Sequence, residues 1–244
     1  EQTDGRFKVA YSISGTALEQ FEAYCPEVIE SFQKLAATGS VEFLCETYYH
    51  SLASLTDEDE FTSQVEKHKK KIEQLFSQTP QIFRNTELIY SDAIGAKVSQ
   101  MGFKAQIAEG AKHVLGWRSP NYLYKNHPDG KMFLLLKNFQ LSDDIAFRFS
   151  QHSWQGFPLT CDKFVSWLNE IENPDCINLF MDYETFGEHQ WKETGIFDFL
   201  KRLPFEVFER SDFDFATPSD LISRYEAKDL VRAPKRLLKR FTII

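Results

Sequence analysis

LFMDYETFGEH, residues 179–189, is where an apolar run changes abruptly into acidic residues. The apolar run begins at position 176 and ends at Met181, and its length predicts a strand buried on both faces. Asp182 and Glu184 follow at once, with Gly187 behind them. Acids at the carboxyl end of a buried strand stand where α/β barrels keep their catalytic groups. The same carboxylates would also serve to cap the next helix, and spacing alone leaves both interpretations open.

Strand-like and helix-like segments alternate along the rest of the chain. Apolar runs are followed by segments with helical spacing, over connections too long for hairpins. This alternation predicts an α/β fold with a parallel sheet, closed as a barrel or left open. The expected strands are residues 7–14, 41–46, 82–86, 103–108, 131–138, 176–181 and 205–208, and the expected helices are residues 17–36, 57–76, 88–101, 143–149, 162–171 and 191–203. We interpret residues 1–218 as one barrel domain and residues 219–244 as a tail without an assigned role.

The composition argues against several functional classes. A net charge of −8 disfavours nucleic acid as a partner, because binding to phosphates requires a basic surface. No apolar run reaches the roughly 18 residues of a membrane span, so no membrane partner is expected. The four cysteines lack CxxC spacing and predict free thiols, which favours the cytoplasm. Without an HExxH motif, a His/Cys cluster or a glycine-rich phosphate loop, neither a metal nor a cofactor is expected.

Acidic residues recur at the ends of the predicted strands. These residues are Glu46, Glu87, Glu109 and Asp182. The carboxyl ends of the strands of a barrel meet at one face, so we expect all four acids at the same mouth. Two carboxylates in one small region perturb each other's ionisation, as acid/base catalysis requires.

Two of these strand ends carry further polar groups. Residues 83–90, FRNTELIY, place an arginine and an asparagine near Glu87, where a cation would keep the carboxylate ionised for nucleophilic attack. The alternative is an ion pair that only fixes a loop. Residues 46–50, ETYYH, offer a wall for a ligand and a hydrogen-bonding histidine, His50, although a lone histidine is more often structural.

A glutamate and an aspartate on separate strands are the minimum set for glycoside hydrolysis. One carboxylate attacks the anomeric carbon, and the other protonates the leaving oxygen and then activates water. The first must be ionised and the second protonated, so their environments must differ. The loop LGWRSPN, residues 115–121, adds groups that bind polar ligands.

These motifs resemble those of glycoside hydrolase family 57, which contains α-amylases, 4-α-glucanotransferases and branching enzymes. Residues 83–90 resemble its nucleophile region and residues 180–187 its acid/base region. The resemblance therefore implies Glu87 as the nucleophile and Asp182 as the general acid/base. Residues 41–50 resemble the region that precedes these two, with Glu42 and His50 matching its pattern. Gly116-Trp-Arg-Ser-Pro-Asn121 is typical of the α-amylase-type members.

The resemblance also implies a fold, a mechanism and a substrate. The fold is a distorted parallel (β/α)7 barrel of the glycoside hydrolase/deacetylase-like kind. The implied reaction is retaining hydrolysis of an α-1,4-glucan or maltooligosaccharide through a covalent glycosyl-enzyme intermediate. The substrate-binding residues expected at the barrel mouth are Glu42, Tyr48, His50, Arg84, Trp117, Arg118, Glu184 and His189.

The chain departs from the family pattern at both ends. It contains no His-Gln-Pro tripeptide, so we expect the opening strand of the barrel to be missing, and no counterpart of the family's C-terminal part is recognisable. A seven-stranded barrel without its opening strand has six strands, but the sequence predicts seven. We therefore expect the segment 205–208 to lie outside the barrel. Glucanosyl transfer shares its intermediate with hydrolysis and stays an alternative, as does a non-catalytic glucan-binding protein.

Overall fold

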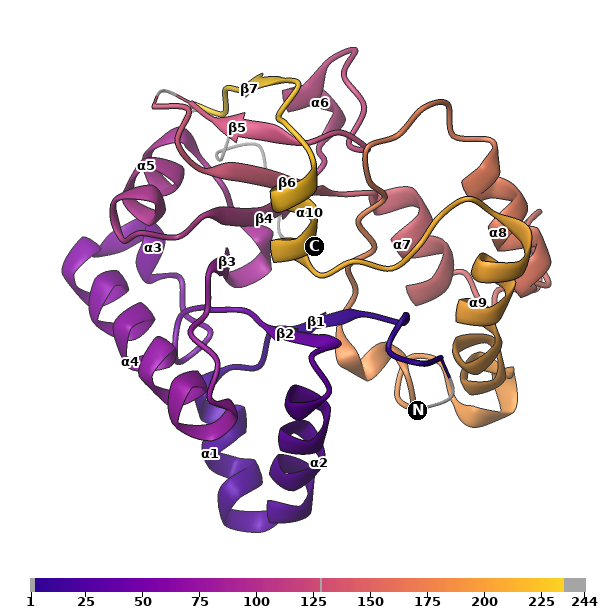
Figure 1. The fold of residues 1–244 in the computed structure, drawn as a ribbon, viewed down its shortest axis with the longest axis horizontal. Coiled ribbons are helices and arrows are strands. Elements are labelled where there is room, and N and C mark those ends of the chain that lie inside the picture. Colours follow the sequence, from indigo (N-terminus) through magenta and orange to yellow (C-terminus); the bar gives the residue numbers. More distant parts are fainter. Residues whose placement is uncertain (1–2, 128, 235–244) are drawn as a thin grey trace.

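The computed structural model describes residues 3–127 and 129–234, and a series of parallel strands forms its centre (Figure 1). Each strand pairs in parallel with the next, and a bridge between Cys45 and Phe83 joins the second strand to the third. In order across the series, the strands are β1 (Val9–Tyr11), β2 (Val41–Phe43), β3 (Ile82–Arg84), β4 (Ala105–Glu109) and β6 (Phe133–Lys137). Their carboxyl ends therefore lie along one edge, as the alternating pattern predicted.

Helices flank these strands on the outside (Figure 1). The helix predicted over residues 57–76 is confirmed as α4, which begins where the Asp57 side chain accepts the N–H groups of Asp59 and Glu60. Pro26 divides the helix predicted over residues 17–36 into α1 and α2. The helices are α1 (Gly15–Tyr24), α2 (Pro26–Ala37), α3 (Ala53–Thr56), α4 (Glu58–Phe76), α5 (Asp92–Gln100), α6 (Lys112–Leu115), α7 (Phe139–Ala146), α8 (Cys161–Asn169), α9 (Ile196–Arg210) and α10 (Pro218–Arg224).

The strands β3, β4 and β6 are buried on both faces. Phe83 and Leu134 pack into a cluster with side chains of α4 and α5. Their sequence neighbours Ile82 and Leu135 face the opposite way, into a cluster that includes Leu221 of α10. Successive residues of a strand point to opposite faces, so two separate cores hold these strands and fix the positions of their ends.

The described part of the predicted tail packs beside the sheet. β7 (Asp229–Val231) pairs in parallel with β5 (Tyr124–Asn126), which pairs antiparallel with β6. α10 precedes β7 and is tied to β2, because the Ser219 N–H donates to the Glu42 carboxylate at 2.9 Å. Residues 235–244 of the predicted tail lie outside the described residues.

The strand predicted over residues 176–181 is wrong as a full strand. This segment makes one parallel bridge to the sheet, between Asn178 and Lys137, and its residues are only partly buried. Ile177 and Leu179 pack toward α7, α8 and α9, while Phe180 packs toward the sheet core. An apolar run indicates that its side chains are buried. It does not indicate whether the backbone has a neighbouring strand to pair with, which a strand also requires.

The strand predicted over residues 205–208 is also wrong, because these residues continue α9. Ile196, Phe199, Leu203 and Val207 are its buried residues at helical spacing. That period overrides the local strand-like composition, and the helix runs through Pro204. Residues 205–208 therefore do lie outside the parallel series.

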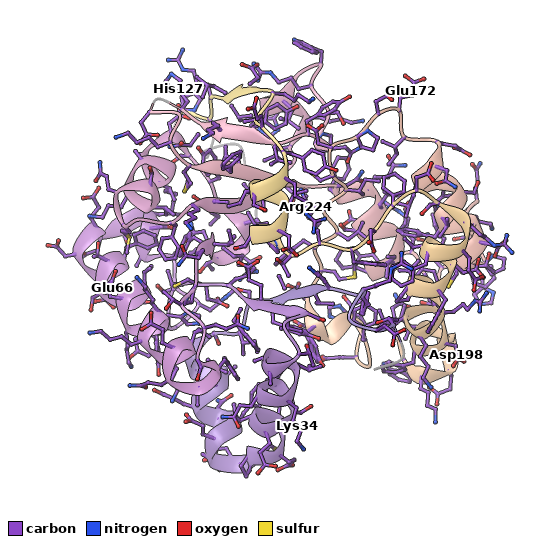
Figure 2. The ribbon with its side chains drawn as sticks, viewed as in Figure 1. Lys34, Glu66, His127, Glu172, Asp198 and Arg224 are labelled. Carbon is purple, nitrogen blue, oxygen red and sulfur yellow. The ribbon has the colours of Figure 1, made fainter. Side chains whose placement is uncertain are left out.

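The surface of the outer helices is charged. Lys34 on α2 and Asp198 on α9 are exposed and point away from the sheet (Figure 2). Within residues 3–127 and 129–234, no helix combines the length and the apolar character that crossing a bilayer requires.

Candidate active site

A pocket of about 120 Å³ opens at the carboxyl ends of β3, β4 and β6. It is the meeting point of the two predicted catalytic carboxylates, because Glu87 and Asp182 both line it. The predicted residues Arg84 and His189 line it as well. The full lining is Arg84, Glu87, Leu88, Glu109, Lys137, Ala146, Phe147, Phe180, Met181, Asp182, Thr185 and His189.

Glu87 reaches the pocket from a turn directly after β3. It lies in the short 3-10 turn Thr86–Leu88, where both Glu87 and Leu88 have a φ of 53°. A left-handed backbone costs a residue other than glycine roughly 1–2 kcal/mol, so the surrounding structure must hold it. The Asn85 side chain does so by donating to Ser54 Oγ and to the Ile89 carbonyl, both at 2.9 Å. The strained turn leaves the Glu87 side chain 69% exposed at the pocket.

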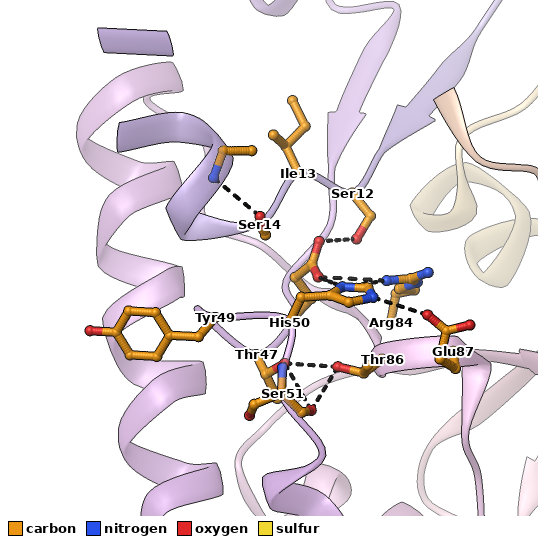
Figure 3. Close-up of polar contacts among 12 residues, drawn as sticks. Ser12, Ile13, Ser14, Thr47, Tyr49, His50, Ser51, Arg84, Thr86 and Glu87 are labelled. Atoms are coloured by element: carbon orange, nitrogen blue, oxygen red, sulfur yellow. Dashed lines mark hydrogen bonds and ion pairs between the residues drawn. The ribbon is translucent and has the colours of Figure 1, made fainter. Parts of the chain in front are cut away.

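His50 joins Glu87 to a second carboxylate (Figure 3). Its Nε2 lies 3.1 Å from Oε1 of Glu87, and its Nδ1 lies 3.0 Å from Oε2 of Glu46. The hydrogen bond with Glu46 raises the pKa of His50, burial opposes this, and the contact with Glu87 raises it further. His50, predicted to bind substrate, therefore lies directly behind the predicted nucleophile.

Glu46 is only 2% exposed and is held by several donors. Ser12 Oγ donates to its Oε1 at 2.8 Å, and Nη1 of Arg84 lies 3.5 Å from its Oε2. Burial acts to raise the pKa of Glu46, but the hydrogen bond from His50 and the charge of Arg84 outweigh it and lower that pKa. Arg84 thus pairs with Glu46, and the contact with Glu87 that the sequence predicted for it is made by His50.

Asp182 lines the pocket from the start of the 3-10 turn Tyr183–Thr185. Its side chain is exposed and makes no hydrogen bond to that turn. Among the described residues, the Asp182 side chain has no hydrogen-bond or ion-pair partner, so the helix-capping interpretation is wrong.

His189 follows the same turn and also lines the pocket. Its N–H donates to the Glu184 carbonyl at 3.0 Å, and its ring stacks on Phe147. Glu184 itself is exposed and does not line the pocket.

Two residues that the sequence does not predict to bind substrate, Glu109 and Lys137, also line the pocket. Lys137 Nζ lies 3.8 Å from Oε2 of Glu109 and 3.7 Å from Oδ1 of Asp143. Burial raises the pKa of Glu109, and the charge of Lys137 opposes that rise. The sequence predicts Glu109 at the barrel mouth because it is an acid at a strand end. Lys137 ends β6 in the same way, so including basic residues at strand ends would predict it too.

Besides His50 and Glu184, four other predicted binding residues do not line this pocket. Glu42 binds Ser219 of α10, and Tyr48 is buried, with its hydroxyl donating to Glu19 on α1. Trp117 is 91% exposed. Arg118 pairs with Asp229 of β7, its Nε lying 3.1 Å from the carboxylate. In the described part of the chain, no group of three or more His, Cys, Asp or Glu residues is arranged to hold a metal ion.

The sequence is similar to those of known proteins. The sequence pattern of glycosyl hydrolase family 57 matches residues 1–234. A putative α-amylase of Methanocaldococcus jannaschii is 48% identical over 223 residues, which cover 91% of this chain and 47% of that protein. The chain thus spans about half the length of this relative.

Two solved structures share the fold at low sequence identity. The 4-α-glucanotransferase of Thermococcus litoralis superposes with a TM-score of 0.77 at 18% identity, over 96% of this chain and 36% of that one. An exo-type maltose-forming amylase of a Pyrococcus species gives a TM-score of 0.71 at 13% identity, over 96% and 42%. These matches confirm the predicted fold class. Within the described residues, no strand pairing joins β1 to β6, the two ends of the parallel series, to close it into a barrel. The chain belongs to glycosyl hydrolase family 57.

Proposed function

We propose that this protein is a retaining glycoside hydrolase of the α-amylase type that acts on α-1,4-glucans, with Glu87 as nucleophile and Asp182 as general acid/base. The observation that carries the proposal is the shared pocket: two carboxylates, from the turn after β3 and from the turn at residues 182–185, line it in different surroundings. Glu87 is held by the ring of His50. Asp182 has no partner among the described residues and is free to exchange protons with a substrate or with water.

The reaction begins with attack by Glu87 on the anomeric carbon. A carboxylate electron pair forms the new bond, and the electron pair of the breaking glycosidic bond goes to the leaving oxygen, which takes the proton of Asp182. Asp182 then removes a proton from water, which attacks the same carbon and returns the Glu87 carboxylate. Retention requires the two carboxyl groups to stand about 5–5.5 Å apart around the bound sugar.

The rest of the lining suits a sugar. Phe147 is 62% exposed and, like Phe180, lines the pocket, so aromatic faces are available to the C–H faces of a glucose ring. Lys137 and Glu109 offer a donor and an acceptor for sugar hydroxyl groups. Specific recognition of a sugar needs both features, and this pocket combines them.

The test combines substitution with product analysis on maltooligosaccharides, using the full-length protein. Glu87→Gln and Asp182→Asn should each lower kcat by about 10³-fold or more, which corresponds to about 4 kcal/mol. Azide should restore turnover of Glu87→Ala and yield a glycosyl azide of inverted configuration, because azide takes the place of the carboxylate. Glu188→Gln removes an exposed carboxylate from the turn that follows Asp182 and should stay close to parental activity.

Two results would contradict the proposal. One is that both substitutions keep more than about a tenth of the parental rate, a loss below about 1.4 kcal/mol. The other is a parental product that first appears with inverted anomeric configuration by NMR. If the products are mainly longer glucans rather than reducing sugars, the enzyme is a glucanotransferase with the same two catalytic residues.

A further inference from the structure

We propose that Glu46 and His50 form a relay behind Glu87: Glu46 keeps a proton on both ring nitrogens of His50, and His50 holds Oε1 of Glu87 so that Oε2 is the attacking atom. Both are positioning residues. The assignment of the attacking atom rests on the proposed function. The protonation of His50 does not, because it follows from contacts within the protein alone.

The first step is the count of donors and acceptors. Each ring nitrogen of His50 faces a carboxylate oxygen, at 3.0 Å for Glu46 and 3.1 Å for Glu87. An ionised carboxylate only accepts hydrogen bonds, and a neutral imidazole carries a single N–H. Neutral His50 would therefore turn a lone pair toward one of the two oxygens. The protonated ring satisfies both contacts.

The second step is the difference between the two carboxylates. Glu46 is buried, accepts a hydrogen bond from Ser12 and forms an ion pair with Arg84, whereas Glu87 is mostly exposed to solvent. Water screens the charge of Glu87 but not that of Glu46, so Glu46 holds the proton on His50 more strongly. The pKa values agree in direction: that of Glu46 is lowered despite its burial, and that of His50 is raised, first by the Glu46 hydrogen bond.

The remaining charged neighbours do not reverse this balance. Nη1 of Arg84 lies 3.3 Å from Nδ1 of His50, where it would donate to a neutral ring, and its charge disfavours the protonated ring. The contact of the same Nδ1 with Oε2 of Glu46 is shorter, at 3.0 Å, and favours a proton on this nitrogen. The same guanidinium also lies 3.5 Å from Oε2 of Glu46, where it helps to keep that carboxylate ionised. Behind Glu46, His68 is buried, and its Nδ1 accepts the Glu46 N–H while Nε2 faces the Ile13 carbonyl, so it is the neutral tautomer.

The third step is rigidity, because a relay needs fixed geometry. His50 has a φ of 51°, so its own backbone is as strained as that of Glu87. The two turns that carry these residues are bonded to each other through the hydroxyl groups of Thr47 and Thr86, 2.9 Å apart (Figure 3). The Thr86 hydroxyl also donates to the Ser51 carbonyl at 2.8 Å. His50 and Glu87 are thus held at a fixed separation before substrate arrives.

The relay has a defined part in each half of the reaction. When Oε2 of Glu87 bonds to the sugar, the charge of Glu87 is lost, and Glu46 alone keeps His50 protonated. When water releases the sugar, the electron pair of the broken bond returns to Glu87, and the N–H of His50 stabilises the charge that develops on Oε1. Removing Glu46 should therefore slow this second half most.

The test observes the ring nitrogens of His50 by long-range ¹H–¹⁵N NMR across pH, with the signals assigned from a His50→Gln variant. We expect both nitrogens to be protonated at pH 7 in the parent. Glu46→Gln should move the titration midpoint of His50 to lower pH, and Glu87→Gln should move it in the same direction by less. The NMR signals of His127, which faces Asp92, should keep their parental positions in both variants.

Kinetics supply a readout that a purely structural role would not change. In Glu46→Gln, the alkaline limb of kcat/KM should move to lower pH together with the midpoint of His50. A His50 that is neutral at pH 7 in the parent, or a midpoint that Glu46→Gln leaves in place, overturns the relay. Glu87 is mostly exposed, so Glu87→Gln keeps the test decisive if Glu46→Gln does not fold; an unchanged midpoint there also overturns it. Azide rescue of Glu87→Ala together with an unshifted His50 would refute the relay and leave the proposed function standing.

Discussion

Nη1 of Arg84 lies 3.5 Å from Oε2 of Glu46, and the two side chains are only 7% and 2% exposed. Arg84 is the last residue of β3, and its guanidinium lies 5.3 Å from the centre of the Phe180 ring, toward the inside of the parallel series. Glu87, three residues later, has a left-handed backbone conformation, and its side chain is exposed to solvent at the pocket. Sequence proximity therefore suggested the wrong partner for Arg84.

Arg84→Met should lower the free energy of unfolding by up to about 3–5 kcal/mol, because it removes the buried cation beside Glu46 and leaves His50 to balance that charge. The measurement is urea unfolding at pH 7. Lys97→Met is the matched control, since it removes a cation from a pair with the exposed Glu58 and should cost less than about 1 kcal/mol. In the double variant Arg84→Met/Glu46→Gln, a loss equal to the sum of the two single losses would show that the pair is not coupled.

His68→Gln should make stability less sensitive to acid. His68 is fully buried, and burial lowers its pKa from an ordinary value of 6.5, against the opposing hydrogen bond to Ile13. Below about pH 6.5, His68 becomes protonated in the unfolded chain but stays neutral in the native state. The free energy of unfolding therefore falls as the pH falls. The raised pKa of His50 acts in the other direction and at higher pH. Unfolding free energies measured between pH 7 and 5 should show a smaller slope in the variant, and an equal slope would refute this role.

Phe147→Ala should raise KM for maltooligosaccharides by about tenfold while changing the melting temperature little. The ring is 62% exposed, so its loss leaves no core cavity, but it removes a face of the pocket that also supports His189. Initial rates across substrate concentration measure the effect. Tyr24→Ala removes an aromatic ring that is 82% exposed at the end of α1 and should leave KM unchanged. A KM that responds equally to both variants would contradict a sugar-binding role for Phe147.

Lys137→Met should also raise KM, with a smaller effect on kcat, because it removes a hydroxyl donor from the pocket without touching Glu87 or Asp182. It also removes the charge that opposes the raised pKa of Glu109, so that pKa should rise further. Lys125→Met is the control, since Lys125 lies over the Phe133 ring outside the pocket. Parental KM in Lys137→Met would exclude this lysine from substrate binding.

Much of the architecture could be predicted from the sequence, because burial and helical period are local signals. Glu87 and Glu109 follow β3 and end β4, and both line one pocket, as the convergence of parallel strands requires. Asp182 lines it from a segment that is not a full strand, and Glu46, the fourth acid expected there, is buried behind His50 and does not line it. The pairing of side chains could not be predicted. Nothing local indicates that His50 meets Glu87 across 37 positions, or that Tyr48 faces Glu19 on α1.

The loop that contains Trp117 shows the same limit. Its composition indicates ligand binding, but Arg118 pairs with Asp229 of β7, and neither Trp117 nor Arg118 lines the pocket. A role for Trp117 in glucan binding stays a prediction, and Trp117→Ala with unchanged affinity for long glucans would assign it to the surface alone.

The most direct test of the central claim is to trap the covalent intermediate. A 5-fluoro glucosyl fluoride of α configuration should react with the full-length protein and stall as a glycosyl ester, and peptide mass spectrometry should then locate the sugar. The account predicts the adduct on the peptide that contains Glu87, with no adduct in Glu87→Gln. An adduct on any other carboxylate, or turnover of this reagent with inversion and no covalent species, would contradict it.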